Sequence, residues 1–481
     1  MNFRPILYVN GILLLILSAS MLIPAIIDLS NDSPDWQVFA ASQIATAFAG
    51  FLLLFSNRQP DFKMTLKETF FLTTSSWVVM AAFGAIPFCL GEHHLSYTDA
   101  FFEAMSGITT TGATVMSGLD SMAHGILFWR VLLHWLGGIG FLVIALAVLP
   151  LLSISGMQIF KTQSFSDIDK FMPSASQMSA YILLIYIGLT VIGSVLFHYA
   201  GMNTFDALSH AMSAVSTGGF ANYDASLGYF NSLKVDFVAT LCMLSGALPF
   251  ALYLRFLRGD RKAIIQDSQV RAYMGIIIFM SLLIMVNIFM SGQMPFISAM
   301  VKSLFTVTSI ITTTGFVSGD YTTWGSVVIA VTFICTFIGS CSGSTAGGIK
   351  IFRLQILWDM LVQQLSSLMS PNGVFKVRYN GKIVTSDVQA AVAGFFFVYI
   401  ATWLFFGFLL MLCNIDFTTA FSGSITALSN VGPGLGNFIG PAGNFSGLHD
   451  LATWILSLAM LVGRLEFMTL LVLLSVRFWK E

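Results

Sequence analysis

Four short segments of the chain carry hydroxyl residues at fixed distances before one glycine. They are residues 106–113 (SGITTTGA), 213–220 (SAVSTGGF), 309–316 (SIITTTGF) and 426–433 (TALSNVGP). Each has a serine or threonine six positions before the glycine and another three positions before it. The copies recur about every 100 residues, which is a long-period internal repeat. Four such loops in one chain can surround a common axis with main-chain carbonyl oxygens, the groups that replace the water shell of a cation.

We therefore predict a cation site made of these loops. Glycine reaches backbone conformations that are closed to residues with a Cβ atom, and hydroxyls at the inner end can add oxygen ligands. The loop cores contain no carboxylate, whereas a calcium site would need several, so neutral oxygens favour a weakly hydrated monovalent ion. The candidate binding residues are Thr109, Thr110, Thr111, Gly112, Ser216, Thr217, Gly218, Gly219, Thr312, Thr313, Thr314, Gly315, Ser429, Asn430, Val431 and Gly432.

The composition places the chain in a membrane. Hydrophobic residues make up 56% of the sequence and charged residues 9%, whereas soluble domains carry about 25% charged residues. The mean hydropathy is +0.83. A net charge of −1 gives no electrostatic basis for binding nucleic acid. We expect a membrane protein in contact with lipid that binds no nucleic acid.

Apolar stretches of transmembrane length recur along the whole chain. They predict ten spans, at about 6–28, 38–56, 70–90, 127–152, 179–200, 234–257, 272–291, 325–352, 388–413 and 450–476. Two spans precede the repeats, and the other eight flank the glycine loops in pairs. The expected fold is an all-α polytopic membrane protein with two N-terminal transmembrane helices. Four repeats of helix, short pore helix, filter loop and helix follow around a central pore.

The basic residues predict the orientation of the chain. Of the 22 lysines and arginines, all but Arg130, Lys234, Lys302 and Arg464 fall on one side of the ten-span arrangement. The positive-inside rule makes this side cytoplasmic, so the glycine loops lie toward the outer side.

A short helix-compatible stretch precedes each loop, at residues 100–108, 207–215, 303–311 and 420–428. The residues thirteen positions before the glycines are Asp99, Asp206, Lys302 and Thr419. All but Lys302 suit an N-cap or a first turn. Helices that enter from outside would direct their partially negative C-terminal ends toward the axis, which favours a cation.

Two features fall on the inner side of the loops. The eighth span is interrupted at residues 339–348 by GSCSGSTAGG, a composition that does not hold a helix in lipid. This segment is either a kink packed against its neighbours or a loop that crosses the pore. Arg464 lies near the middle of the last span, where an uncompensated arginine costs at least about 2.5–3.5 kcal/mol. It therefore faces the bundle interior or water, and an ion pair with Glu466 or another acid is the alternative.

Together these motifs resemble the bacterial TrkH/KtrB-type potassium uptake proteins, and the chain is more similar to the TrkH branch. The resemblance rests on the four loops, on FFEAMSGITTTGA at residues 101–113, on GSCSGSTAGGIKIFR at 339–353 and on GRLEFMTLL at 463–471. It covers essentially the full length and includes the two extra N-terminal helices.

The resemblance implies uptake of K⁺ through a single-chain filter in the bacterial inner membrane, with K⁺ bound only at the filter. It implies that the interrupted span is a gate and that Arg464 is an electrostatic barrier beside the pore. The gate residues are then Gly339, Ser340, Ser342, Gly343, Ser344, Thr345, Gly347, Gly348, Lys350 and Arg464.

The same resemblance implies a homodimer and a cytoplasmic, TrkA-like regulatory subunit that binds nucleotides. The chain itself carries no Rossmann or P-loop fingerprint, so we expect no organic cofactor and no enzyme activity. The expected units are 1–66 for the N-terminal helices and 67–170, 171–265, 266–370 and 371–481 for the four pore repeats.

Three other classes of protein were weighed against this one. A secondary transporter that couples K⁺ or another solute to Na⁺ or H⁺ would fit broken helices, but such proteins have two related halves where this chain has four units. A membrane-embedded enzyme needs a clustered set of catalytic side chains, and the spans offer none. A structural membrane protein leaves the fourfold repeat without an explanation.

Overall fold

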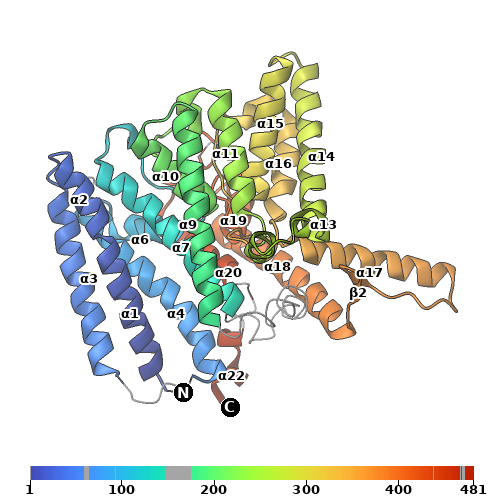
Figure 1. The fold of residues 1–481 in the computed structure, drawn as a ribbon, viewed down its shortest axis with the longest axis horizontal. Helices are drawn as coiled ribbons and strands as arrows, with labels where there is room; N and C mark the ends of the chain where they lie inside the picture. The colour runs from blue at the N-terminus through green and yellow to red at the C-terminus, as the bar shows by residue number, and fades with distance from the viewer. Residues whose placement is uncertain are drawn as a thin grey trace.

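The computed structural model describes residues 2–58, 64–92, 94–147, 175–436, 438–465, 467 and 472–480. Almost all of the described elements are helices, and most of the long ones run in the same direction across the molecule (Figure 1). Both termini lie at the lower end of this view. An even number of membrane crossings brings the two ends of a chain to the same side. The predicted boundary between residues 170 and 171 lies outside the described residues.

The first three helices form a separate group at the left of Figure 1. They are α1 (Arg4–Ser20), α2 (Leu22–Ser30) and α3 (Trp36–Ser56). The first two form one continuous apolar stretch, and α3 packs back along α1. This group corresponds to the two N-terminal spans that the sequence predicts.

The rest of the chain repeats one succession of elements four times: a long helix, a short helix, an irregular loop and another helix. The first copy comprises α4 (Leu66–Gly84), α5 (Ile86–Leu90), α6 (Tyr97–Ile108) and α7 (His124–Ala147), and the second α9 (Ala175–Tyr199), α10 (Thr204–Val215) and α11 (Leu233–Gly246). The third comprises α14 (Ser268–Met290), α15 (Phe296–Ile311) and α16 (Ser326–Phe337), and the fourth α18 (Ser386–Leu412), α19 (Phe417–Ser429) and α20 (Asp450–Arg464).

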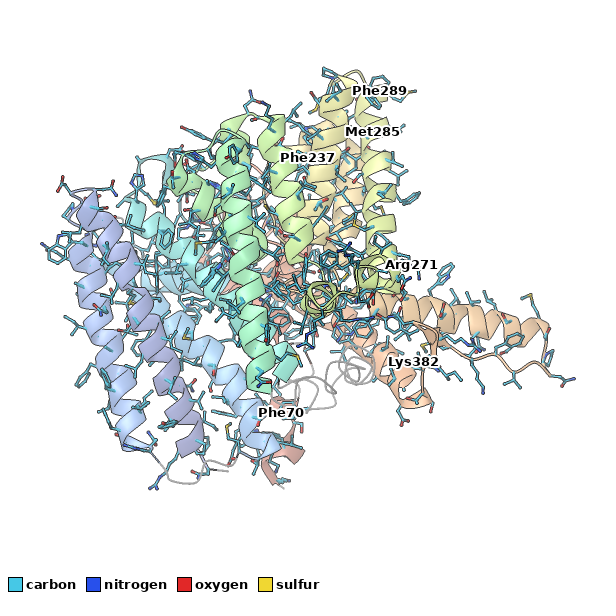
Figure 2. All side chains as sticks on the ribbon, viewed as in Figure 1. Phe70, Phe237, Arg271, Met285, Phe289 and Lys382 are labelled. Atoms are coloured by element: carbon cyan, nitrogen blue, oxygen red, sulfur yellow. The ribbon has the colours of Figure 1, made fainter. Side chains whose placement is uncertain are left out.

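The remaining elements connect these copies. They are α12 (Phe250–Leu257), α13 (Ala263–Gln266), α17 (Ile351–Met369), the hairpin of β1 (Arg378–Tyr379) and β2 (Lys382–Ile383), and α22 (Val476–Lys480). Helix α17 leaves the bundle and extends to the right of Figure 1. Figure 2 shows Phe237 and Phe289 on the outer surface of the upper half, whereas Arg271 and Lys382 lie lower, near the level of α17. This separation of apolar and basic surface agrees with the predicted cytoplasmic side.

Most of the predicted spans are confirmed, and three differ. Among the described residues, seven helices are long and apolar enough to cross a membrane, and they match the first five, the seventh and the ninth predicted spans. The sixth span is bent by 89° between α11 and α12, because Pro249 lacks the N–H that a continuous helix needs. Helix α16 ends at Phe337, twelve residues after it begins. Helix α20 ends at Arg464, and most of the rest of the tenth predicted span lies outside the described residues.

The short helices begin earlier than the apolar pattern suggested. Ser96, Asn203 and Asp416 are the N-caps of α6, α10 and α19, and their side chains accept hydrogen bonds from the amides of the residues three positions on. Those residues are Asp99, Asp206 and Thr419, so their predicted place in a first turn is confirmed. Helix α15 begins at Phe296 after Pro295 and has no side-chain cap, and Lys302 lies in its second turn.

Glycines bring three of the four inner helices directly against the ends of the short helices. A Cβ atom added to Gly137, Gly246 or Gly463 would overlap the carbonyl oxygen four positions before the repeat glycine, which belongs to Ile108, Val215 or Leu428 respectively. Small residues at such crossings let helix backbones approach closely in a membrane. The same contact in three repeats therefore fixes the depth of each short helix.

Replacing Gly246 with alanine is expected to destabilise the protein by about 1–3 kcal/mol, the usual cost of overpacking. The matched control is Gly275→Ala in α14, where an added Cβ would meet nothing within 4 Å. Both changes carry the same gain in helix propensity, so the difference between them isolates the overlap with Val215. Thermal unfolding of the purified proteins in detergent, followed by tryptophan fluorescence, measures it. Equal midpoints for the two variants would contradict this packing argument.

Candidate functional site

The four short helices end in the same way, and positions in each loop are counted from its glycine. The amide at position −1 donates to the carbonyl at −6, with N···O distances of 2.9 Å in all four loops. The amide at −2 donates to the carbonyl at −5, at 3.0–3.2 Å. These two bonds define the Schellman motif, which closes a helix with a left-handed residue. The repeat in the sequence is thus a repeated helix end.

The left-handed residues of these motifs are not glycines. They are Thr110, Thr217, Thr313 and Asn430, with φ of 54°, 54°, 57° and 56°. Asparagine tolerates this region, but a β-branched threonine there is a genuine outlier, and such strain persists only where the surroundings impose it. Two positions later, Gly112, Gly219, Gly315 and Gly432 again have positive φ. Left-handed residues at alternate positions turn successive carbonyl groups toward one side of the chain.

The four glycines lie against one another's loops in cyclic order. A Cβ atom on Gly112 would overlap the carbonyl oxygen of Gly218, one on Gly219 that of Thr314, and one on Gly315 that of Val431. A Cβ atom on Gly432 would lie 2.7 Å from the carbonyl oxygen of Thr111 and so completes the circle. Each glycine thus touches position −1 of the next loop. Loops about 100 residues apart in the chain therefore surround one centre.

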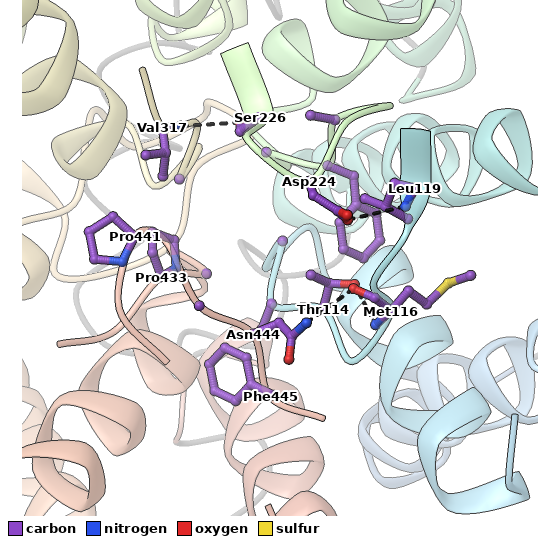
Figure 3. A pocket seen from close by; sticks show the side chains of 18 of the residues that line it. Thr114, Met116, Leu119, Asp224, Ser226, Val317, Pro433, Pro441, Asn444 and Phe445 are labelled. Atoms are coloured by element: carbon purple, nitrogen blue, oxygen red, sulfur yellow. Dashed lines mark hydrogen bonds between the residues drawn. The ribbon is translucent and has the colours of Figure 1, made fainter. Parts of the chain in front are cut away.

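A cavity of about 280 Å³ opens above this centre, and all four glycines line it. Figure 3 shows its wall, with Thr114 and Met116 from the first repeat facing Pro433 and Pro441 from the fourth. Asp224 is the one carboxylate among the residues that line the cavity. It accepts hydrogen bonds from the amides of Gly118, at 2.8 Å, and Leu119, at 3.1 Å. A negative group at the mouth of a narrow cleft raises the local concentration of cations.

Tyr223, which also lines this cavity, donates from its hydroxyl to Asp206 Oδ2 at 2.8 Å. Burial and the negative charge of Asp206 raise the pKa of Tyr223. The hydroxyl therefore stays neutral and continues to hold the outgoing strand of the second loop.

The repeated hydroxyls have structural partners. At position −6, Ser213 Oγ accepts from the amide of Gly219 at 3.0 Å, and Ser309 Oγ donates to the carbonyl of Phe316 at 2.7 Å. Thr426 Oγ1 bonds the carbonyl of Pro433 in the same manner. These bonds tie the end of each short helix to the chain that leaves the glycine. The hydroxyls at −3 are also engaged: those of Thr109, Ser216 and Thr312 donate to carbonyls of their own helices, and that of Ser429 bonds Tyr399.

The glycine-rich segment of the eighth span lies directly against the inner ends of three loops. The hydroxyl of Thr217 donates to that of Thr345 at 3.1 Å. The amide of Gly347 donates to Thr313 Oγ1 at 2.8 Å. A Cβ atom on Gly347 would overlap the carbonyl oxygen of Ser429. The segment therefore covers the inner end of the ring.

This segment is a compact and mostly buried loop. A Cβ atom on Gly339 would overlap the carbonyl oxygen of Gly347, so the two limbs of the loop touch. Gly343 accepts from the amide of Phe250 at 2.9 Å, and the amide of Ser342 donates to Gln269 at 2.7 Å. The hydroxyls of Ser340 and Ser344 bond each other across the loop, and Gly343 and Gly348 supply its positive φ values.

Two cations stand at this loop. Arg464 Nη1 donates to the carbonyl oxygen of Thr345 at 2.9 Å, and its guanidinium carbon lies 4.0 Å from the centre of the Phe141 ring. Lys350 Nζ donates to the carbonyl of Ala346 and lies 5.6 Å from the same ring. Arg464 is 2% exposed, so it faces the protein interior, as the sequence predicts. Glu466, the partner that the sequence left open, lies outside the described residues.

Sequence reasoning gave no role to Arg130 and left Glu103 and His134 as structural residues. In the structure Arg130 and Glu103 form a buried ion pair behind the first two loops. His134 lies against the second loop, where its Nε2 is 3.3 Å from the amide of Phe220. A signal was present, because Arg130 is one of the four basic residues that break the inside rule. Among the described residues, no group of three or more His, Cys, Asp or Glu side chains could hold a metal ion.

Comparison with known proteins identifies relatives along the whole chain. A sequence model of the family described as "TrkH: Cation transport protein" matches residues 35–480. The Trk system potassium uptake protein TrkI of Halomonas elongata is 42% identical over 484 residues, which cover 100% of this chain and 98% of the relative. The Trk system potassium uptake protein TrkH of Escherichia coli is 34% identical over 491 residues and is covered completely. The crystal structure of the potassium transporter TrkH from Vibrio parahaemolyticus superposes with a TM-score of 0.92 at 33% identity, covering 100% of both chains.

Proposed function

The chain belongs to the TrkH family of cation transport proteins, and from this premise we propose that it carries K⁺ into the bacterial cytoplasm through a filter formed by its four loops. It is a multi-pass helical protein of the inner membrane. The membrane potential supplies about 2.3 kcal/mol per charge for every 100 mV, which is sufficient for inward movement. No chemical step is required.

The observation that carries this proposal is the cyclic contact of the four glycines above a shared centre. K⁺ enters the cavity beside Asp224, loses its water at the ring and is held by main-chain carbonyls of the residues at positions −3 to 0. A Cβ atom at the glycines would occupy the place of the neighbouring carbonyl, so this position admits only glycine. Neutral oxygens bind the ion weakly enough for it to leave again.

Passage further inward is controlled by the loop at residues 339–348. Its hydrogen bonds to Thr217 and Thr313 lie below the ring, so an ion cannot leave the filter until the loop moves. Arg464 holds the loop by the carbonyl of Thr345 and adds a positive charge that opposes a cation at this depth.

Replacing Thr345 with valine is expected to raise basal flux about fivefold, because it removes a hydrogen bond that stabilises the closed loop by about 1 kcal/mol. The Thr345 hydroxyl donates to the carbonyl of Gly246 at 3.0 Å and accepts from Thr217. Thr336→Val is the matched control, since the Thr336 hydroxyl bonds only within α16. Uptake of ⁸⁶Rb⁺ by proteoliposomes compares the two. The proposal for the loop is wrong if both variants transport at the same rate.

Two partners belong to this proposal. The first is a second copy of the chain. It is supported by α17, which projects from the bundle and exposes Trp358, Leu365 and Leu368 by 65%, 51% and 70%, more apolar surface than a helix at the cytoplasmic side leaves to water. The second is a cytoplasmic, TrkA-like nucleotide-binding subunit, which rests on the family resemblance. It would act on the loop from the inner side.

Uptake of ⁸⁶Rb⁺ into liposomes that contain the purified protein tests the proposed function. Unlabelled K⁺ is expected to compete strongly, Cs⁺ less and Na⁺ least, because a ring of neutral carbonyls favours the weakly hydrated ions of this size. Liposomes without protein give the background. Equal competition by all three ions would refute a selective filter.

A further inference from the structure

Behind each loop, a side chain of the short helix holds the strand that leaves the glycine. The partner on the strand is the residue three positions after the glycine in every repeat. The four contacts use different groups: Glu103 Oε2 with the amide of Val115 at 3.0 Å, Asp206 Oδ1 with Asn222 Nδ2 at 2.8 Å, Lys302 Nζ with the carbonyl of Ser318 at 3.3 Å, and Ser422 Oγ with the amide of Leu435 at 2.9 Å. The repeats thus share a fastening point, although their sequences show no common residue there.

The first repeat differs because its fastening includes a buried ion pair. Arg130 Nε lies 2.8 Å from Glu103 Oε1, and the two side chains are 1% and 0% exposed. The Thr114 hydroxyl donates to both carboxylate oxygens of Glu103, at 2.9 and 3.0 Å. With the amide of Val115, the carboxylate therefore holds two successive residues of the first outgoing strand.

The guanidinium of Arg130 extends this contact to the second loop. Nη1 donates to the carbonyl oxygen of Ala221 at 2.9 Å, and Nη2 donates to Thr114 Oγ1 at 3.1 Å. The guanidinium carbon also lies 4.2 Å from the centre of the Phe220 ring. Phe220 and Ala221 directly follow Gly219. One planar group thus joins the strand that leaves the first loop to the strand that leaves the second.

We propose that Arg130 and Glu103 are positioning residues that set the spacing of the first two filter loops and so determine how well the protein discriminates K⁺ from Na⁺. This inference rests on the proposed function. Removing one partner of a buried ion pair is costly, whereas keeping the pair adds little stability over apolar residues, so stability alone does not explain a charged pair at this place. The bonds from Nε, Nη1 and Nη2 leave in three fixed directions, and a lysine ammonium cannot reproduce that fork.

The pair also balances charge at the mouth of the filter. Arg130 is among the residues that line the outer cavity, and Glu103 neutralises it. Glu103→Gln leaves an uncompensated positive charge where K⁺ enters, which raises the K⁺ concentration for half-maximal uptake. The double variant Glu103→Gln/Arg130→Gln restores neutrality but not the fork. The two roles therefore separate: charge governs apparent affinity, and the fork governs selectivity.

The test compares Arg130→Lys, Glu103→Gln and the double variant by ⁸⁶Rb⁺ uptake with K⁺ and Na⁺ as competitors. We expect all three to lose about tenfold in the ratio of K⁺ to Na⁺ competition, since ring geometry sets that ratio. Only Glu103→Gln should show weakened half-saturation by K⁺. Asp260→Asn, which removes the exposed ion pair of Arg255 and Asp260, is the matched control and should keep the ratio of the unmodified protein.

A second measurement covers variants that express poorly. Thr114→Val keeps the shape of the side chain and removes its bonds to both members of the pair, and it should shift selectivity in the same direction. The increase in thermal midpoint on adding K⁺ rather than Na⁺ reports selective binding without transport, and this difference should shrink in every variant. Unchanged K⁺ to Na⁺ ratios in folded variants of a selective parent protein would overturn this inference. An unselective parent protein would overturn the proposed function instead.

Discussion

Replacing Gly219 with alanine is expected to abolish selective K⁺ uptake. The added Cβ atom would overlap the carbonyl oxygen of Thr314, and Gly219 has a φ of +90°, a conformation that costs a residue with a side chain about 1–2 kcal/mol. The overlap involves main-chain atoms on both sides, so neither can give way without opening the ring. We expect ⁸⁶Rb⁺ uptake to fall at least about 100-fold, the effect of roughly 2.7 kcal/mol on a rate.

Gly201→Ala is the matched control for this change. Gly201 has a φ of +112°, and an added Cβ atom would meet nothing within 4 Å. It shares the backbone strain but not the contact with a neighbouring loop, so it should lower stability slightly and leave uptake nearly intact. Transport by folded Gly219→Ala protein at the level of Gly201→Ala would show that the glycine contacts do not form the conducting ring.

Replacing Arg464 with alanine is expected to raise the basal flux about tenfold, because a hydrogen bond from a charged donor stabilises the closed loop by about 1.5–3 kcal/mol. Arg464 Nη1 is bound to the carbonyl of Thr345, and the guanidinium stacks over Phe141. The arginine thus joins the fourth repeat to the loop of the third and to a helix of the first. The substitution also removes a positive charge from the inner side of the filter, which acts in the same direction.

Arg464→Lys separates the two contributions. Lysine keeps the charge but lacks the planar fork that both bonds a carbonyl and stacks on a ring. High flux in Arg464→Ala with low flux in Arg464→Lys assigns the effect to charge, and high flux in both assigns it to the hydrogen bond. Voltage-clamp recordings across a planar bilayer give the rates, and size-exclusion chromatography checks the fold. Parent-level flux in a well-folded Arg464→Ala protein would remove this residue from the mechanism.

The sequence predicted the helices well where the signal was local. Apolar length located seven spans, and the first-turn places of Asp99, Asp206 and Thr419 followed from N-cap preferences. It failed where a helix was interrupted without losing hydrophobicity. The bend between α11 and α12 lies within an apolar stretch, and hydropathy alone does not register a change of direction.

The site divides in the same way. The four glycines and the interrupted eighth span were found by residue type and spacing, since glycine clusters have few other uses in lipid. The left-handed threonines were not foreseen, because threonine is a poor choice for that conformation by itself. The fork of Arg130 was missed because its partners, Glu103, Thr114 and Ala221, come from three separate segments.

The amino-acid order alone thus determined the membrane class, the fourfold repeat, the family resemblance and the residues that could surround an ion. These properties depend on hydrophobic length and on spacing within short segments, which a linear pattern contains. Only the tertiary structure decided which carbonyl faces which glycine, where the inner loop rests and which charges meet. Those contacts join residues far apart in the chain, and they exist only after the helices have packed against one another.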